Sequence, residues 1–334
     1  MNSDSRRLTE GLLAGDTRAI ARSISCVEAD GTTGVEIIKG VFGHSGRAYL
    51  IGVTGPPGVG KSSLVDRLTA QIRRSGRTVG VLAVDPTSPF TGGAVLGDRV
   101  RMQAHAGDPG VFVRSMATRG QLGGLARATA DAAVILDAAG FELIVIETVG
   151  VGQAEVEISR AADMTIVVTM PGSGDGVQAL KAGVMEIADL FLVNKADHEG
   201  ADRAVAEIET MLGLNTYGTD DWRPPVLQTR ALEGVGIDRV EEAVDRFRAR
   251  RDVEVQQRRR ARVDARVRHL VSDRFLEHVE HRALNPGTLG YWLGRVVSAD
   301  VDPYTAAEQI VRNALGEGDG LAPGADMSGG EGNR

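Results

Sequence analysis

The residues of this chain best suited to bind phosphate are a lysine, a serine and several glycines at fixed spacing. The segment Gly55-Pro-Pro-Gly-Val-Gly-Lys61-Ser62 fits the pattern G-x-x-x-x-G-K-[ST]. In such a loop, backbone N–H groups wrap around phosphate, the lysine reaches the β- and γ-phosphates, and the serine hydroxyl binds Mg²⁺. A plain glycine-rich turn between a strand and a helix is the alternative interpretation. The residues expected to bind the nucleotide are Gly55, Pro56, Pro57, Gly58, Val59, Gly60, Lys61, Ser62 and Ser63.

Lysine is scarce in this chain, which makes Lys61 informative. Only four of the 38 basic residues are lysines, at positions 39, 61, 181 and 195. Where the rest of the sequence uses arginine, a retained lysine indicates a need for a compact ammonium that a planar guanidinium cannot replace. We expect Lys61 to be catalytic as well, because it would neutralise charge that develops on the phosphates.

A second motif, Asn194-Lys195-Ala196-Asp197, follows the apolar run LFLV and concerns the base of the nucleotide. A carboxylate at Asp197 could accept hydrogen bonds from N1 and N2 of guanine, and adenine offers no such pair. A site built on such bonds rejects the wrong base strongly, so GTP is expected in preference to ATP. An Asn-x-x-Asp cap after a strand is the alternative, but the position after a phosphate loop and a later strand favours guanine.

The segment after the run PVLQ is expected to complete the base site. In GTP-binding proteins this position presents a backbone N–H to the guanine O6. The expected contacts here are Arg230, Ala231 and Leu232.

Acidic residues at the ends of apolar runs are candidates for metal and switch chemistry. Glu147 ends LIVI and precedes Thr148-Val149-Gly150, where a Walker-B-type carboxylate belongs. Asp85 ends TVGVLAV and opens a long Gly/Pro-rich stretch that reaches Asp98. A loop of that length is unusual in a compact domain unless it is functional. Helix capping or turn formation is the alternative for Asp85 and Asp98.

A further loop, residues 171–181, is a candidate switch. Its glycines permit movement, and Asp175, Gln178 and Lys181 could sense the nucleotide or a partner. An ordinary strand-to-helix loop is the equal alternative.

The pattern of apolar runs predicts an α/β fold with a doubly wound, mostly parallel sheet. Short Val/Ile/Leu-rich runs alternate with helical segments, as buried parallel strands do. Three helices are expected before the first strand, at 5–14, 16–27 and 32–41. The strands are expected at 49–55, 78–85, 110–115, 143–150, 164–170, 190–197 and 225–231.

We expect four parts along the chain: an N-terminal helical extension (1–45), a P-loop domain (46–236), a C-terminal helical region (237–315) and a disordered tail (316–334). In the third part an apolar stripe repeats every four residues and would have to be buried. It either packs on its own domain or forms a dimer arm. The stripe comprises Val263, Val267, Val271, Phe275 and Val279, broadened by Leu270 and Leu276.

Composition narrows the class of protein. The net charge of -7 and pI near 5.5 argue against nucleic acid as a partner. Arginines 258–260 have acidic neighbours and are expected to form a solvated helix face. The single cysteine, Cys26, excludes an intrachain disulfide. The apolar runs are only strand-length, so we expect no membrane segment and a cytoplasmic protein.

Six segments together resemble the MeaB/ArgK (MMAA-type) family of SIMIBI-class P-loop GTPases. They are VTGPPGVGKSSL, VDPTSPFTGGAVLGDRVRM, RSMATRGQLGGLA, ETVGVGQAEVEI, GVQALKAGVMEIAD and VNKAD. The resemblance covers roughly residues 40–236. One departure is the segment TRAL, where the family usually has a small Ser before the Ala; Arg230 could keep only a backbone role there.

The resemblance implies both residues and partners. The metal ligands it implies for Mg²⁺ are Ser62, Asp85, Asp98 and Glu147, and Glu147 and Asp98 would also be catalytic. Gln153 would lie in switch II, and Lys181 would lie in a third switch. The resemblance implies a GTP-hydrolysing chaperone, typically a homodimer, that binds an adenosylcobalamin-dependent acyl-CoA mutase. Methylmalonyl-CoA mutase is the main client expected, and the protein would gate loading and protection of the cobalamin, which it meets only through the mutase.

Three other functions stay open at this point. A P-loop kinase of a small molecule or transport protein would transfer phosphate to an acceptor. A nickel-insertion GTPase is expected to have a His- or Cys-rich segment that stores the metal, yet only His278 and His281 share a helical face. A non-hydrolysing scaffold would need GTP for shape alone.

Overall fold

The computed structural model describes residues 1–29, 31–85, 103–105, 107–117, 124–148, 154–172, 185–218, 221–250, 252–284 and 286–316. These residues fall into two compact units, Met1–Arg262 and Val263–Arg334. The division lies within one helix, α12 (Asp252–Ala283). The four-part division expected from the sequence stays a prediction.

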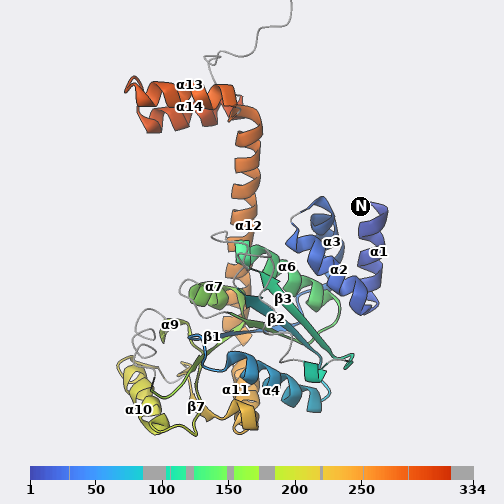
Figure 1. The fold of residues 1–334 in the computed structure, drawn as a ribbon, viewed down its shortest axis with the longest axis vertical. Helices are drawn as coiled ribbons and strands as arrows, with labels where there is room; N and C mark the ends of the chain where they lie inside the picture. Colours follow the sequence, from blue (N-terminus) through green and yellow to red (C-terminus); the bar gives the residue numbers. More distant parts are fainter. Residues whose placement is uncertain are drawn as a thin grey trace, which may run out of the picture. The chain divides into compact units, whose positions relative to one another are not determined.

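The first unit is built on a seven-stranded parallel sheet in the order β3-β2-β4-β1-β5-β6-β7. Strands β1, β2, β3 and β7 are labelled in Figure 1. Its strands are β1 (Tyr49–Thr54), β2 (Val79–Asp85), β3 (Val111–Ala117), β4 (Leu143–Glu147), β5 (Met164–Thr169), β6 (Leu190–Asn194) and β7 (Val226–Thr229). β1 lies between β4 and β5, where the winding of the chain reverses, and ligands of such sheets bind at the carboxyl ends beside that point. The doubly wound α/β fold predicted from the sequence is confirmed.

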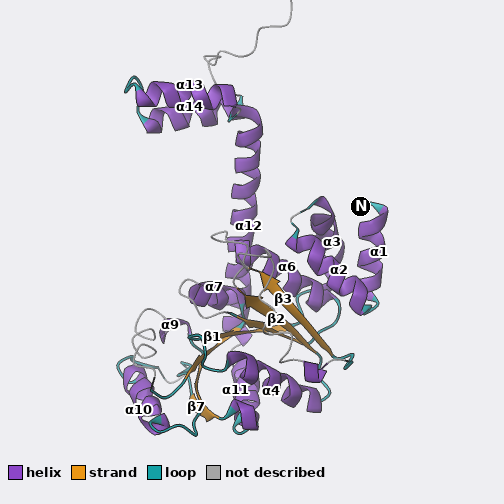
Figure 2. Ribbon diagram, in the orientation of Figure 1, coloured by secondary structure: helices purple, strands orange, loops and turns teal. Residues whose placement is uncertain are grey.

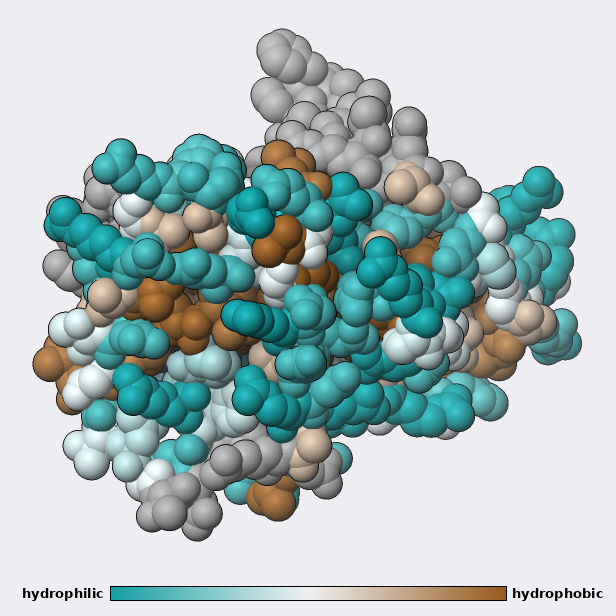
Figure 3. Space-filling model, turned by 90° about the horizontal axis from the view of Figure 1, so that it is seen from below, coloured by the Kyte–Doolittle hydropathy of each residue, from teal (hydrophilic) through white to brown (hydrophobic). Residues whose placement is uncertain are grey.

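Helices cover both faces of the sheet, which explains why its central strands are apolar throughout (Figure 2). α4 (Lys61–Arg74) and α11 (Ile237–Arg250) supply the apolar side chains of one core, and α6 (Gly124–Ala138) those of the other. α7 (Ala154–Ala161) packs on β1 and β5, and α10 (Ala201–Leu212) on β6 and β7. Hydrophilic residues predominate on the face shown in Figure 3, as expected for the outer sides of amphipathic helices.

Three N-terminal helices pack on one another and on α6: α1 (Ser3–Leu13), α2 (Thr17–Glu28) and α3 (Thr32–Val41). α1 starts two residues before the expected position because the Asn2 side chain accepts a hydrogen bond from Ser5 N–H and caps the helix. Asp16 caps α2 in the same way. Short elements complete the unit: η1 (Phe42–His44), η2 (Gln103–His105), α9 (Met185–Ile187) and η4 (Ala231–Glu233).

The arginine run near the start of α12 does not form a solvated face, so that expectation is wrong for two of its three residues. Arg258 binds both carboxylate oxygens of Asp189 at 2.7 and 2.8 Å. Arg259 binds Asp163 at 2.8 and 3.1 Å, and Arg262, one turn later, binds it at 3.1 Å. Only Arg260 is exposed. The two aspartates are buried directly before β5 and β6, and burial requires a partner for each charge.

The second unit contains the rest of α12, α13 (Pro286–Val297) and α14 (Pro303–Leu315). Its small core joins Val279, Ala283 and Ala314. Of the predicted apolar stripe only Val279 is buried, at 5% exposure, whereas Val263, Val267, Val271 and Phe275 are 42–62% exposed. None of the described helices is both long and apolar enough to cross a membrane. The predicted tail lies outside the described residues, apart from Gly316, which caps α14.

A two-pronged ion pair between α4 and the segment before β3 yields a prediction about pH. Arg73 Nε and Nη2 donate to the two carboxylate oxygens of Asp108 at 2.9 and 3.0 Å. These bonds, with one from Gly110 N–H, hold the pKa of Asp108 below its usual value. We expect Asp108→Asn to lower the free energy of unfolding at pH 7 by about 1 kcal/mol.

The sign of the pH dependence follows from the lowered pKa of Asp108. The stabilisation is complete above the unfolded pKa of about 3.9 and disappears as the pH falls through the lower folded value. Urea denaturation of both proteins between pH 7 and pH 2 measures this. A difference that stays constant below pH 4 would contradict the assignment.

Candidate nucleotide-binding site

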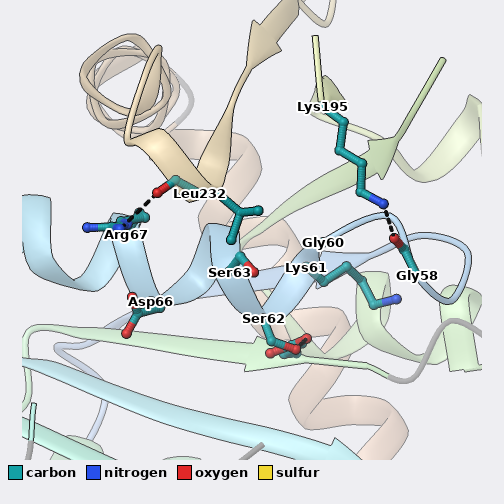
Figure 4. A pocket seen from close by; sticks show the side chains of 10 residues that line it. Gly58, Gly60, Lys61, Ser62, Ser63, Asp66, Arg67, Lys195 and Leu232 are labelled. Atoms are coloured by element: carbon teal, nitrogen blue, oxygen red, sulfur yellow. Dashed lines mark hydrogen bonds between the residues drawn. The ribbon is translucent and has the colours of Figure 1, made fainter. Parts of the chain in front are cut away.

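A cavity of about 580 Å³ lies where β1 leads into α4, and Figure 4 shows its lining. The volume suits a small-molecule site. It brings together residues from α4, β4, the segment after β6 and the turn after β7, which lie far apart in the sequence. The lining residues are Gly58, Gly60, Lys61, Ser62, Ser63, Asp66, Arg67, Glu147, Lys195 and Leu232.

The loop from Gly55 to Gly60 is shaped by glycines that no other residue could replace. Gly55 has φ +142°, and a Cβ there would lie 2.0 Å from the carbonyl oxygen of Val168 in β5. Gly60 has φ +95°, and its Cβ would lie 2.5 Å from the Asn194 side-chain nitrogen. The backbone therefore turns tightly and leads into the N-terminus of α4, where free N–H groups attract anions.

Lys61 is the first residue of α4 and is only 6% exposed. Its Nζ donates to the carbonyl oxygens of Gly55 and Pro56 at 2.7 and 3.0 Å. The ammonium is thus held within the curve of the loop. This is the position from which it could reach phosphates wrapped by the loop.

Ser62 and Glu147 form the part of the cavity that fits a metal ion. The Ser62 hydroxyl donates to Oε1 of Glu147 at 2.7 Å, and Glu147 is 5% exposed at the end of β4. A hydroxyl and a buried carboxylate are hard oxygen donors of the kind Mg²⁺ prefers. The residues present therefore fit the ion.

The other predicted metal and switch residues are placed only in part. Asp85 ends β2 at the same edge of the sheet, because Ala83, two residues earlier in β2, pairs with Glu147 of β4. Its side chain is outside the described part of the structure, as are Asp98 and Gln153. The predicted third switch residues, Asp175, Gln178 and Lys181, are outside it too.

Asn194 ties the phosphate loop to the predicted base site. Its side chain is buried; Nδ2 donates to the Val59 carbonyl at 2.8 Å, and Oδ1 accepts from Thr229 Oγ1 at 3.1 Å and from Ala231 N–H at 3.0 Å. Lys195 adds a second link, since its Nζ donates to the Gly58 carbonyl at 2.8 Å (Figure 4). The φ of +56° at Lys195 is rare for a residue with a side chain and typical of functional sites.

Asp197 and the turn after β7 surround this region. The Asp197 carboxylate is about half exposed, 3.7 Å from His198 Nε2, and is not one of the lining residues. The Arg230 guanidinium pairs with Glu233 at 2.8 Å, and the Ala231 N–H is directed to Asn194. Of the three residues predicted here, Leu232 lines the cavity, with 76% exposure.

Comparison with known proteins shows the family of this chain. Residues 20–283 match the family described as methylmalonyl Co-A mutase-associated GTPase MeaB. The chain belongs to the MeaB family.

Several known proteins are similar to this chain over most of their length. A putative GTPase of Pyrococcus abyssi is 48% identical over 93% of this chain and 97% of its own. The GTPase ArgK of Escherichia coli is 35% identical over 71% of this chain and 74% of its own. The crystal structure of a LAO/AO transport system kinase superposes with a TM-score of 0.69 at 26% identity, covering 93% of this chain and 97% of the other. The recognition of a P-loop GTPase of this family from sequence is confirmed.

Two lining residues were missed by the analysis of motifs: Asp66 and Arg67. They follow Ser62 and Ser63 by four residues and therefore lie on the same face of α4 as these two residues of the phosphate loop. Asp66 also lies 3.1 Å from His105 Nε2 in η2. The helical period could have indicated both residues, because the motif fixes where the helix begins.

Asp197 offers a test of base recognition in this MeaB-family site. An amide at this position presents a donor where guanine N1–H and N2–H need acceptors, and the 2-oxo group of xanthine could accept from it. We expect Asp197→Asn to weaken GTP binding by roughly 10- to 100-fold and to strengthen binding of xanthosine triphosphate. Competition titration with the two nucleotides measures this. Equal changes for both nucleotides would contradict recognition by Asp197; His198→Ala serves as the neighbouring control.

Proposed function

We propose that this protein hydrolyses GTP to GDP and phosphate. We further propose that it binds a cobalamin-dependent acyl-CoA mutase and that GTP turnover gates the loading and protection of the cofactor of that enzyme. The observation that carries the proposal is the single cavity in which Lys61, the Ser62–Glu147 pair and Lys195 meet. Phosphate, metal and base functions of a GTPase would thus be served within reach of one nucleotide.

The residues of the cavity divide the chemistry between them. The glycines of the loop and the N-terminus of α4 would hold the phosphates, and Lys61 would neutralise charge on the β–γ bridge and γ-phosphate. Ser62 and Glu147, with Asp85 and Asp98 as further proposed ligands, would hold Mg²⁺, which when bound offsets phosphate charge. Asn194, Lys195 and Asp197, with the backbone of residues 230–232, would hold guanine. GTPases that lack a supplied arginine or glutamine are slow, with rates of about 10⁻² s⁻¹ or less, which suits a timing function.

The proposed client is methylmalonyl-CoA mutase or a related mutase. Adenosylcobalamin would be bound by the mutase, and this protein would contact the cofactor only in complex with that enzyme. The family is described by its association with this mutase. In addition, a Caenorhabditis elegans protein named methylmalonic aciduria type A homolog, mitochondrial, is 35% identical over 70% of this chain and 63% of its own. The exposed stripe Val263, Val267, Val271 and Phe275 supports a homodimer formed through α12, because a water-exposed apolar face of a helix is stabilised when a second copy covers it.

Co-purification with methylmalonyl-CoA mutase, combined with GTPase rates, tests the proposal. We expect complex formation that depends on the bound nucleotide and a rise in the GTPase rate with added mutase. The matched control is Lys61→Ala, which would keep the surface and lose turnover. No binding and no rate change with any cobalamin-dependent mutase would rule out the chaperone function and leave the GTPase site unaffected.

A kinase function is the second candidate, because the protein whose crystal structure superposes on this chain is named a transport system kinase. The two reactions differ in where the γ-phosphoryl group goes. With γ-labelled GTP, hydrolysis releases all the label as inorganic phosphate, whereas a kinase transfers it to a small molecule or protein. Label on any acceptor would favour the kinase.

A further inference from the structure

We propose that Arg67 is a positioning residue for guanine recognition, an inference that rests on the proposed GTP site. Arg67 lies in the second turn of α4, and its Nη2 donates to the carbonyl oxygen of Leu232 at 2.8 Å (Figure 4). Leu232 is the middle residue of η4, the turn proposed to meet the guanine O6. The helix that begins at the phosphate loop would therefore also orient the segment that reads the base.

Bonds within the turn give it its shape, including Glu233 N–H to the Arg230 carbonyl at 3.0 Å and Gly234 N–H to the Ala231 carbonyl at 3.2 Å, and Arg67 links the turn to α4. Arg230 exchanges two backbone hydrogen bonds with Val235, at 3.1 and 3.2 Å, and closes the base of the turn. Ala231 N–H is bound by Asn194. The Leu232 side chain is 76% exposed, so packing alone does not fix this residue. The peptide group that joins Leu232 to Glu233 is thus bonded on both sides: its N–H donates to the Arg230 carbonyl, and its carbonyl accepts from the charged Arg67, which fixes its position relative to α4.

Arg67 also lines the cavity, so a direct contact with the sugar or phosphates must be separated from a positioning role. The two differ in which part of the nucleotide they affect. Positioning of the turn acts on recognition of the O6 atom of guanine. A direct contact acts equally on any nucleotide with the same sugar and phosphates. The diphosphate of 2-aminopurine riboside keeps the 2-amino group, sugar and phosphates of GDP and lacks O6, so it distinguishes them.

The experiment measures binding of GDP and of 2-aminopurine riboside diphosphate to the full chain and three variants. We expect Arg67→Ala to weaken GDP binding about tenfold, the effect of one charge-assisted hydrogen bond, and binding of the analogue less than twofold. Arg67→Lys should lie between, because an ammonium can also donate to the carbonyl but lacks the rigid, planar geometry of the guanidinium. Arg74→Ala is the matched control: Arg74 is an exposed arginine of the same helix, bonded to Gln71 at 3.0 Å and outside the cavity lining.

Two results would overturn the inference: equal losses for GDP and the analogue, which indicate a direct contact, or no loss for either. Amide hydrogen exchange in peptides covering residues 229–235, without nucleotide, adds a readout of the turn itself. We expect faster exchange in Arg67→Ala, and unchanged exchange would also contradict positioning. Failure of the wild-type protein to bind GDP would overturn the proposed function, whereas normal wild-type binding with an unaffected Arg67→Ala overturns this inference alone.

Discussion

Lys61→Ala is expected to lower the GTPase rate by about 10² to 10³, the usual effect of removing one preorganised group that stabilises developing charge. Lys61 is the only lysine that the structure places inside the phosphate loop among the described residues, and its Nζ is held by the Gly55 and Pro56 carbonyls. A lost side chain there leaves two carbonyl oxygens facing the phosphate region and no cation between them. We expect a smaller loss of GDP affinity, because the loop N–H groups remain.

Lys61→Arg tests whether the compact ammonium matters. We expect it to be nearly as inactive as Lys61→Ala, since the planar guanidinium is too large for the curve between two carbonyls. Lys39→Ala is the matched control, because Lys39 is an exposed lysine of α3. Single-turnover assays with GTP and Mg²⁺ measure the chemical step. Turnover of Lys61→Ala close to that of the wild type would exclude the proposed catalytic role.

Asp163→Ala is expected to have the largest effect on stability, a loss of about 3 to 5 kcal/mol in the free energy of unfolding. Asp163 is 0% exposed and accepts hydrogen bonds from Arg259, Arg262 and the Leu50 N–H. Hydrogen bonding to Asp163 raises the pKa of Arg259. Removal of the carboxylate leaves two partly buried guanidiniums without the opposite charge they pair with, although they keep bonds to backbone carbonyls, and leaves the Leu50 N–H without its acceptor.

Two further variants separate charge from shape at this position. Asp163→Asn keeps the volume and one acceptor and should lose less than Asp163→Ala. The control variant Asp264→Ala breaks an exposed ion pair between Asp264 and Arg268, both in α12. It should change the free energy of unfolding by less than about 0.5 kcal/mol. Urea denaturation followed by circular dichroism measures all three. A loss below about 1 kcal/mol in Asp163→Ala would contradict the assigned role of the buried carboxylate.

The fold was predictable from sequence because its signals are local. Buried parallel strands need continuous apolar runs, and seven such runs became the seven strands; the run at 49–55, for example, became β1 (Tyr49–Thr54). The phosphate loop was equally predictable from sequence, because the local backbone conformation requires glycine there: Gly55, Gly58 and Gly60 all have positive φ values.

The predictions that depended on distant partners were less successful. Arg258 and Arg259 were predicted to lie on a solvated helix face because their sequence neighbours are acidic. Their actual partners, Asp189 and Asp163, lie 69 and 96 residues away in the sequence. Arg67 carries no motif, and its role depends on a carbonyl 165 residues further along the chain. The roles of the metal-binding residues and the base-binding segment stay predictions that the experiments above address.

The buried amide of Asn194 has a consequence for nucleotide exchange. Its bonds reach three segments: the phosphate loop through Val59, β7 through Thr229 and the turn after β7 through Ala231. Because the three bonds share one side chain, separation of any one segment removes a bond that fixes the amide for the other two. We therefore expect the residence time of a bound nucleotide to be set by infrequent opening of the whole pocket, and not by release of the base followed by release of the phosphates. A nucleotide exchange factor would then need to bind and displace only one of the three segments to accelerate release of the whole nucleotide.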